Sequence, residues 1–70
     1  MNTAKLRGKI AEKGFTITYF CEAANINRST FDRKVAGRGE FTREEIEKII
    51  RVLEMTDEET RIIFFTESVA

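Results

Sequence analysis

The stop and start signals along this chain allow only short helices. Gly14 and Asn25 belong to the residue types that most readily adopt the left-handed conformation found just past a helix end. Thr16 and Asn27 belong to the types that cap helix N-termini, because their side chains accept hydrogen bonds from free backbone amides. Since each cap follows closely on a stop signal, the sequence predicts three short helices, of which the second and third are joined by a turn of about three residues.

The rest of the chain also has helical spacing. Thr42 and Glu45 stand three positions apart, as do Thr56 and Glu59, and this spacing is typical of a capping box at a helix start. An apolar stripe at helical spacing follows the first pair, and no strand-like alternation competes with it. We expect an all-α, compact five-helix fold, with helices at about residues 3–13, 17–24, 27–35 and 57–66 and a further helix that carries the stripe at Ile46, Ile49, Ile50 and Leu53.

Size and cysteine content limit what such a fold can contain. A chain of 70 residues is expected to form a single domain, 1–70, near the lower limit for a fold held by a hydrophobic core alone. The single cysteine, Cys21, cannot form an internal disulfide, and the absence of histidine removes common zinc ligands and the commonest general base. No apolar run is long enough to span a membrane, and no signal peptide is evident. We expect a cytoplasmic protein with no membrane, metal or cofactor site and no enzymatic activity.

Charge is distributed unevenly along a chain whose net charge is zero. Residues 1–39 carry eight basic and three acidic residues, a net charge of +5, whereas residues 40–70 carry four basic and nine acidic ones. A domain of this kind can place its basic half on phosphate groups while its acidic half faces away. Chance also produces uneven charge in a small protein, and that alternative stays open.

Residues 16–36 form the segment most informative about function. Helical spacing turns Phe20, Ile26 and Phe31 toward the core. We expect small Cys21 to lie where the two helices cross and where a bulkier side chain would not fit. Two short helices joined by a tight turn, with exposed polar residues on the second, are the arrangement that places a helix in the DNA major groove. The outer face of the second helix is predicted to consist of Arg28, Ser29, Asp32 and Arg33, with Thr30 and Lys34 at its edges.

This segment resembles the phage-repressor and Cro-like class of helix-turn-helix proteins, and the resemblance extends over about residues 3–54. Cys21, Asn25 and Asn27 stand where that family typically has a small residue, a glycine and a serine or threonine cap. The stretch from Ser29 to Lys34 is similar to the family's recognition helix, and the two ends of the chain resemble those of small prophage-encoded regulators. The resemblance implies a lambda-repressor-like DNA-binding fold in which early outward residues of the second helix read bases.

Side-chain chemistry assigns candidate roles on this surface. Arginine can donate two hydrogen bonds to guanine, which is worth about 1–3 kcal/mol of discrimination, and hydroxyl groups can contact base edges or phosphate. Asp32 would repel phosphate, and we expect it to pair with Arg28 on the same helix. The candidates for base reading are Arg28, Ser29, Thr30 and Arg33. The candidates for phosphate contact are Lys9, Lys34, Arg38 and Arg43, although ordinary solvated charge explains each of them equally well.

Two features also favour a protein partner. Ile17 stands where the family commonly has a glutamine that touches phosphate. Ile62, Phe64 and Phe65 add more apolar surface to the last helix than one face can bury, so we expect an interface there, most simply in a homodimer, unless the small core uses all of them. The chief hypothesis is a Cro-like or repressor-like transcriptional regulator that reads an operator in double-stranded DNA. The alternative is a modulator or antirepressor that binds a partner repressor protein through the same domain.

Overall fold

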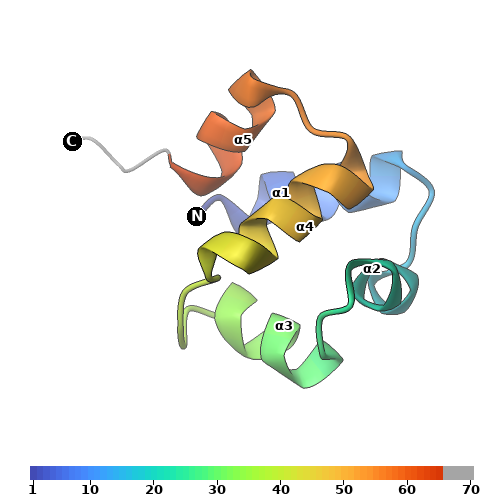
Figure 1. Ribbon diagram of the computed structural model, residues 1–70, viewed down its shortest axis with the longest axis vertical. Coiled ribbons are helices and arrows are strands. Elements are labelled where there is room, and N and C mark those ends of the chain that lie inside the picture. Colours follow the sequence, from blue (N-terminus) through green and yellow to red (C-terminus); the bar gives the residue numbers. More distant parts are fainter. Residues whose placement is uncertain (66–70) are drawn as a thin grey trace.

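The computed structural model describes residues 1–65 and folds them into five α-helices, with no strand among those residues (Figure 1). The all-α prediction is therefore confirmed for this part of the chain. The last helix, predicted at about 57–66, is seen up to Phe64, and position 66 lies outside the described residues. Within residues 1–65 no helix is long and apolar enough to cross a lipid bilayer. The helices are α1 (Thr3–Glu12), α2 (Ile17–Ala24), α3 (Arg28–Val35), α4 (Arg43–Leu53) and α5 (Asp57–Phe64).

A polar side chain begins every one of these helices. In each case the residue before the helix accepts a hydrogen bond from a first-turn backbone amide that would otherwise lack a partner. At Thr42 and Thr56 the glutamate three positions later also accepts from the amide of the capping residue, so both predicted capping boxes are confirmed. The capping residues are Asn2, Thr16, Asn27, Thr42 and Thr56.

The turn between α2 and α3 consists of Asn25, Ile26 and Asn27. Asn25 adopts the left-handed conformation, with φ 57° and ψ 46°, as its residue type predicts. The amide of Ile26 donates to the carbonyl of Cys21 at 2.9 Å, which closes the end of α2, and the Ile26 side chain is buried. The Asn27 side chain accepts from two first-turn amides of α3, at 2.8 and 3.3 Å. Because both ends of the turn are fixed in this way, α3 begins in a defined orientation relative to α2.

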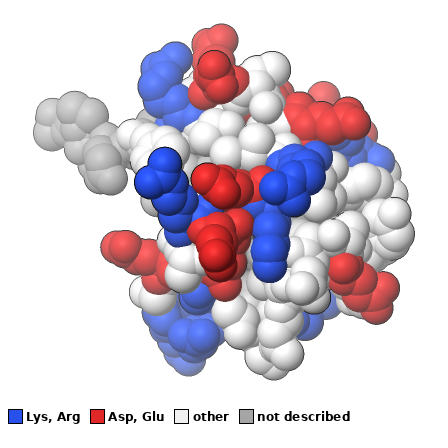
Figure 2. All heavy atoms as spheres, viewed as in Figure 1, with Lys and Arg blue, Asp and Glu red and all other residues white. Residues whose placement is uncertain are grey.

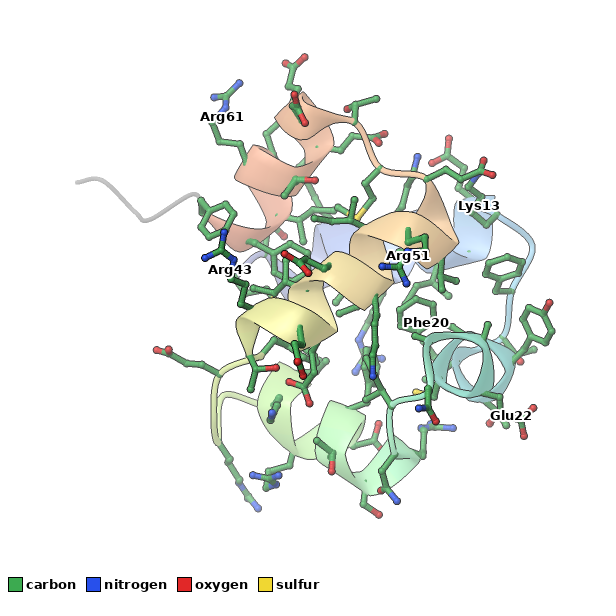
Figure 3. All side chains as sticks on the ribbon, in the orientation of Figure 1. Lys13, Phe20, Glu22, Arg43, Arg51 and Arg61 are labelled. Carbon is green, nitrogen blue, oxygen red and sulfur yellow. The ribbon has the colours of Figure 1, made fainter. Side chains whose placement is uncertain are left out.

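The hydrophobic core surrounds α4, which crosses the middle of the molecule with α5 on one side and α2 and α3 on the other (Figure 1). Phe20 points from α2 toward α4 (Figure 3), and its ring meets that of Phe31 edge-on, with centroids 5.7 Å apart. Cys21 belongs to the same core, and burial raises the pKa of its thiol, as expected for a structural cysteine. The largest fully buried side chains are Phe20, Phe31, Leu6, Ile10, Ile49 and Leu53.

Contacts between distant parts of the chain connect α1 to the helices on both sides of the molecule. The Asn2 amide donates to the carbonyl of Ile63 at 2.7 Å, and α1 packs against α5. The hydroxyl of Thr3 donates to the carbonyl of Val35 at 3.4 Å. The start of α1 therefore supports the last turn of α3, the helix expected to carry the functional site.

Candidate nucleic-acid interface

The outward side of α3 carries the residues that helical spacing predicts. Arg28, Ser29, Asp32 and Arg33 are exposed, and these four residues are termed the α3 face. Thr30 is half-buried at its edge. Since the opposite side of the helix is anchored in the core, the α3 face is presented to solvent on a rigid support.

Arg28 is held by side chains from two helices. Its Nε donates to Oδ1 of Asp32 at 3.2 Å, so the predicted pair within α3 is confirmed. Its Nη1 donates to Oγ1 of Thr18 on α2, at 2.8 Å. The sequence does not predict the Thr18 contact, because the two residues stand ten positions apart and meet only after α2 has packed on α3. The Arg28 side chain stays 51% exposed despite both contacts.

The start of α2 offers a different polar group from the one that the family resemblance implies. Ile17 is half-buried and packs against the core, so it directs no donor to a ligand. Tyr19 is 53% exposed, and its ring lies 4.9 Å from that of Phe15. The hydroxyl of Thr18 is therefore the polar group by which the start of α2 reaches the α3 face.

Arg33 and Arg38 carry charge that no described carboxylate neutralises. Within residues 1–65, neither guanidinium group forms a hydrogen bond or an ion pair. Their backbones lie together, because the Arg38 amide donates to the Arg33 carbonyl at 3.0 Å just past the end of α3. Basic side chains gather at the lower left edge of Figure 2, beside α3 and the loop that follows it. Two free positive groups thus stand at the C-terminal end of α3.

Lys34 forms an ion pair inside the fold. Its Nζ lies 2.7 Å from Oε1 of Glu45 on α4, and the two side chains are only 11% and 19% exposed. The same ammonium lies 5.8 Å from the centre of the Phe41 ring. Burial acts to raise the pKa of Glu45, but hydrogen bonds from Lys34 and the Thr42 amide outweigh burial and hold that pKa below its ordinary value of 4.5. The first role of Lys34 is therefore to attach α3 to α4.

The other predicted phosphate contacts divide between paired and free groups. Lys9 Nζ lies 3.0 Å from Glu59 on α5, and this hydrogen bond raises the pKa of Lys9 above its ordinary value. Arg43 Nε lies 3.6 Å from Glu47 one turn later, with both side chains largely exposed. Arg38 is the member of the predicted set that has no acidic partner among residues 1–65.

Ion pairs also join the basic and acidic parts of the sequence. Within the described chain, lysines from residues 1–39 meet glutamates from residues 40–70 in three pairs: Lys9 with Glu59, Lys13 with Glu54 and Lys34 with Glu45. Acidic and basic side chains are accordingly interleaved on the face that Figure 2 shows. The charge of +5 counted along residues 1–39 therefore overstates the positive charge that is free to attract an anionic ligand.

A groove lined by both apolar and polar residues lies beside the C-terminal end of α3. Ile63 is buried, Ile62 and Phe64 are half-buried, and Phe65 is 59% exposed. The ring of Phe64 packs edge-on against Phe41, with centroids 6.3 Å apart. The predicted apolar excess of the last helix is thus reduced to one exposed ring and the groove next to it. This groove is termed the Phe65 groove. Its apolar lining residues are Met1, Val35, Ala36, Phe41, Ile46, Phe64 and Phe65, and the others are Thr3, Lys34, Gly37, Gly39 and Glu40.

Comparison with known proteins gives a family but no activity. A family model described as "Protein of unknown function (DUF739)" matches residues 1–67, nearly the whole chain. Neither the curated proteins nor the solved structures contain a match. These comparisons therefore assign no function to the chain.

Proposed function

The chain belongs to the DUF739 family, and we propose that it is a sequence-specific DNA-binding transcriptional regulator, Cro-like or repressor-like, with α2 and α3 as its helix-turn-helix. The observation that carries this proposal is the α3 face, a row of exposed polar and basic side chains on a short helix whose start is capped and whose other side is buried. An α-helix with its side chains is about 10–12 Å wide, which fits the roughly 12 Å of the DNA major groove.

Charge and position assign some of these residues to base contacts and others to phosphate contacts. Arg28, Ser29 and Thr30 lie in the first turn of α3, where a recognition helix commonly contacts base edges, and Arg33 follows one turn later. Arg38 is the best-placed phosphate contact, because its charge is free and it follows α3 directly. Lys9, Lys34 and Arg43 would have to leave or share a carboxylate partner to bind phosphate.

The Phe65 groove supports a homodimer as the working form of this regulator. The groove adjoins the C-terminal end of α3, so a second copy packed there would lie next to that helix. A two-fold dimer can read two half-sites one helical turn apart, about 34 Å along the duplex. The exposed phenylalanine at the edge of this groove also favours the second candidate function, a modulator that binds a partner repressor protein there.

The first test is to select binding duplexes from a random DNA pool. The affinity for the selected duplex and for a shuffled duplex is then measured by fluorescence anisotropy between about 50 and 200 mM salt, the range over which phosphate contacts weaken markedly. We expect tighter binding to the selected duplex and a steep loss of affinity with salt. Arg38→Ala should lower the slope of log Kd against log salt by about 1, since each neutralised phosphate contributes roughly 0.9.

Arg61 provides a matched control for Arg38. It is also an exposed arginine, but it lies on α5 and points outward at the end of the molecule opposite α3 (Figure 3). Arg61→Ala should leave both the affinity and the salt slope unchanged. If the folded chain enriches no duplex even at low salt, the DNA-binding proposal is wrong, and the modulator becomes the better candidate.

A further inference from the structure

The strongest unexplained contact on the α3 face is the one between Arg28 and Thr18. A guanidinium group has five N–H donors in a rigid planar fork. Asp32 and Thr18 accept from two of its nitrogens, on α3 and α2 respectively. The Arg28 side chain remains half exposed, so donors are left over for a ligand. Two hydrogen-bond partners thus orient the arginine in the ligand-free protein.

We propose that Thr18 and Asp32 are positioning residues that hold Arg28 as a preset reader of guanine. The inference rests on the proposed DNA-binding function and deepens it, because it names the base that the site prefers. A free arginine loses side-chain freedom when it docks on a base, and this loss reduces affinity. For Arg28 most of the freedom is already lost in the folded protein, so little is lost on binding.

The charge of Asp32 directs Arg28 to bases rather than to the DNA backbone. The carboxylate neutralises much of the positive charge of Arg28 and repels nearby phosphates. What remains attractive is the directional pairing of the leftover N–H donors with the O6 and N7 acceptors of guanine. Arg33 offers the contrast on the same helix, since its guanidinium has no side-chain partner within residues 1–65.

The test removes the Thr18 hydroxyl without changing the size of the side chain. Thr18→Val and Thr18→Ser would be compared with Arg28→Ala on the selected duplex and on duplexes in which each guanine in turn is replaced by 7-deazaguanine or by adenine. Arg28→Ala should abolish the preference at one guanine, roughly a 5- to 150-fold effect for a bidentate contact. Thr18→Val should weaken preference at that same guanine by about 3- to 10-fold and leave binding to shuffled DNA unchanged. Thr18→Ser should restore it.

If Thr18→Val fails to fold, Asp32→Asn provides an independent test of how Arg28 is positioned. Freed from its carboxylate, Arg28 should bind phosphate as well, so affinity for shuffled DNA and the salt slope should both rise while preference for the guanine falls. In the free protein, the Arg28 Nη1–H resonance should exchange faster with water in Thr18→Val than in the unmodified chain, because Thr18 accepts from Nη1.

The outcomes separate this inference from the function it rests on. If the unmodified chain binds a selected duplex but Thr18→Val weakens all duplexes equally, or leaves the Arg28 resonance unchanged, the positioning role is wrong and DNA binding stands. The positioning role is also wrong if the Thr18 and Arg28 variants affect different guanines. If the folded chain binds no DNA, both the proposed function and the positioning role fail.

Discussion

Within residues 1–65, two helices end at a non-glycine residue with positive φ. Asn25 ends α2 at φ 57°, and Glu54 ends α4 at φ 52°. For most L-residues this conformation costs about 1–2 kcal/mol, whereas asparagine tolerates it best. Glu54 has a compensating contact, because its Oε1 lies 2.7 Å from Nζ of Lys13 and this pair lowers the pKa of Glu54. For Asn25 we expect the backbone preference of asparagine for positive φ to be what stabilises the turn.

Replacement of Asn25 should separate backbone preference from side-chain contacts. We expect Asn25→Ala to lower the free energy of unfolding by about 1 kcal/mol, because alanine has no local compensation for positive φ. Asn25→Gly should stay within about 0.5 kcal/mol of the original chain, since glycine adopts this conformation without steric cost. Urea unfolding followed by circular dichroism measures both values.

Glu22→Ala is the control in the same helix, because Glu22 is exposed and points away from the core (Figure 3). It should change stability by less than about 0.5 kcal/mol. Equal losses in Asn25→Ala and Asn25→Gly would contradict the backbone account and assign the effect to the asparagine side chain.

At the scale of the helix, the signals read from the sequence are local and therefore reliable. The helix expected at residues 17–24 is observed as Ile17–Ala24, and the one expected at 27–35 as Arg28–Val35, because the caps and the turn act within one or two turns of chain. Contacts between helices could not be predicted in the same way. Thr18 meets Arg28 and Lys34 meets Glu45 only because of how the helices pack, and nothing in the spacing of those residues indicates it.

The cap of α3 gives a prediction about the helix that carries the candidate site. Asn27→Ala removes two hydrogen bonds to first-turn amides and should destabilise the protein by about 1 kcal/mol. Because the loss falls at one end of α3, hydrogen exchange should quicken most at the amides of Ser29 and Thr30. Asn27→Asp should restore most of the protection, since aspartate caps as well as asparagine.

The core amides provide the internal reference for this experiment. The backbone amides of α4 should all exchange faster by one common factor. That factor is the one predicted from the loss in the free energy of global unfolding. If the amides of Ser29 and Thr30 quicken by that same factor and no more, the Asn27 cap stabilises the whole fold without holding the start of α3.

At the scale of the whole molecule, folding redistributes charge that the sequence presents as two halves. Lysines from residues 1–39 meet glutamates from residues 40–70 in three ion pairs, so a count along the chain predicts a stronger dipole than the folded surface has. The candidate interface could be predicted as a helix face, because spacing determines which residues point outward. Which of its charges remain free could not, because that depends on partners far away in the sequence.

The pair between Lys34 and Glu45 is the least exposed of these contacts and predicts a pH dependence of stability. The pKa of Glu45 is lower in the folded chain than its ordinary value of 4.5, so its ionised form stabilises the fold. This contribution is complete above pH 4.5 and disappears as pH falls through the lowered folded pKa. Glu45→Gln keeps an oxygen for the Thr42 amide and removes the charge. We expect it to lower the free energy of unfolding by about 1–2 kcal/mol at pH 7.

The decisive quantity is the difference in stability between the original chain and Glu45→Gln, measured by urea unfolding from pH 7 to pH 3. It should stay constant down to about pH 5 and shrink toward zero below pH 4.5, since the protonated carboxyl resembles the amide. Glu47→Gln is the matched control on the same helix, because its pair with Arg43 is 3.6 Å long and exposed, and such pairs contribute little. A difference for Glu45→Gln that persists unchanged at pH 3 would mean that shape and hydrogen bonding, rather than charge, join α3 to α4.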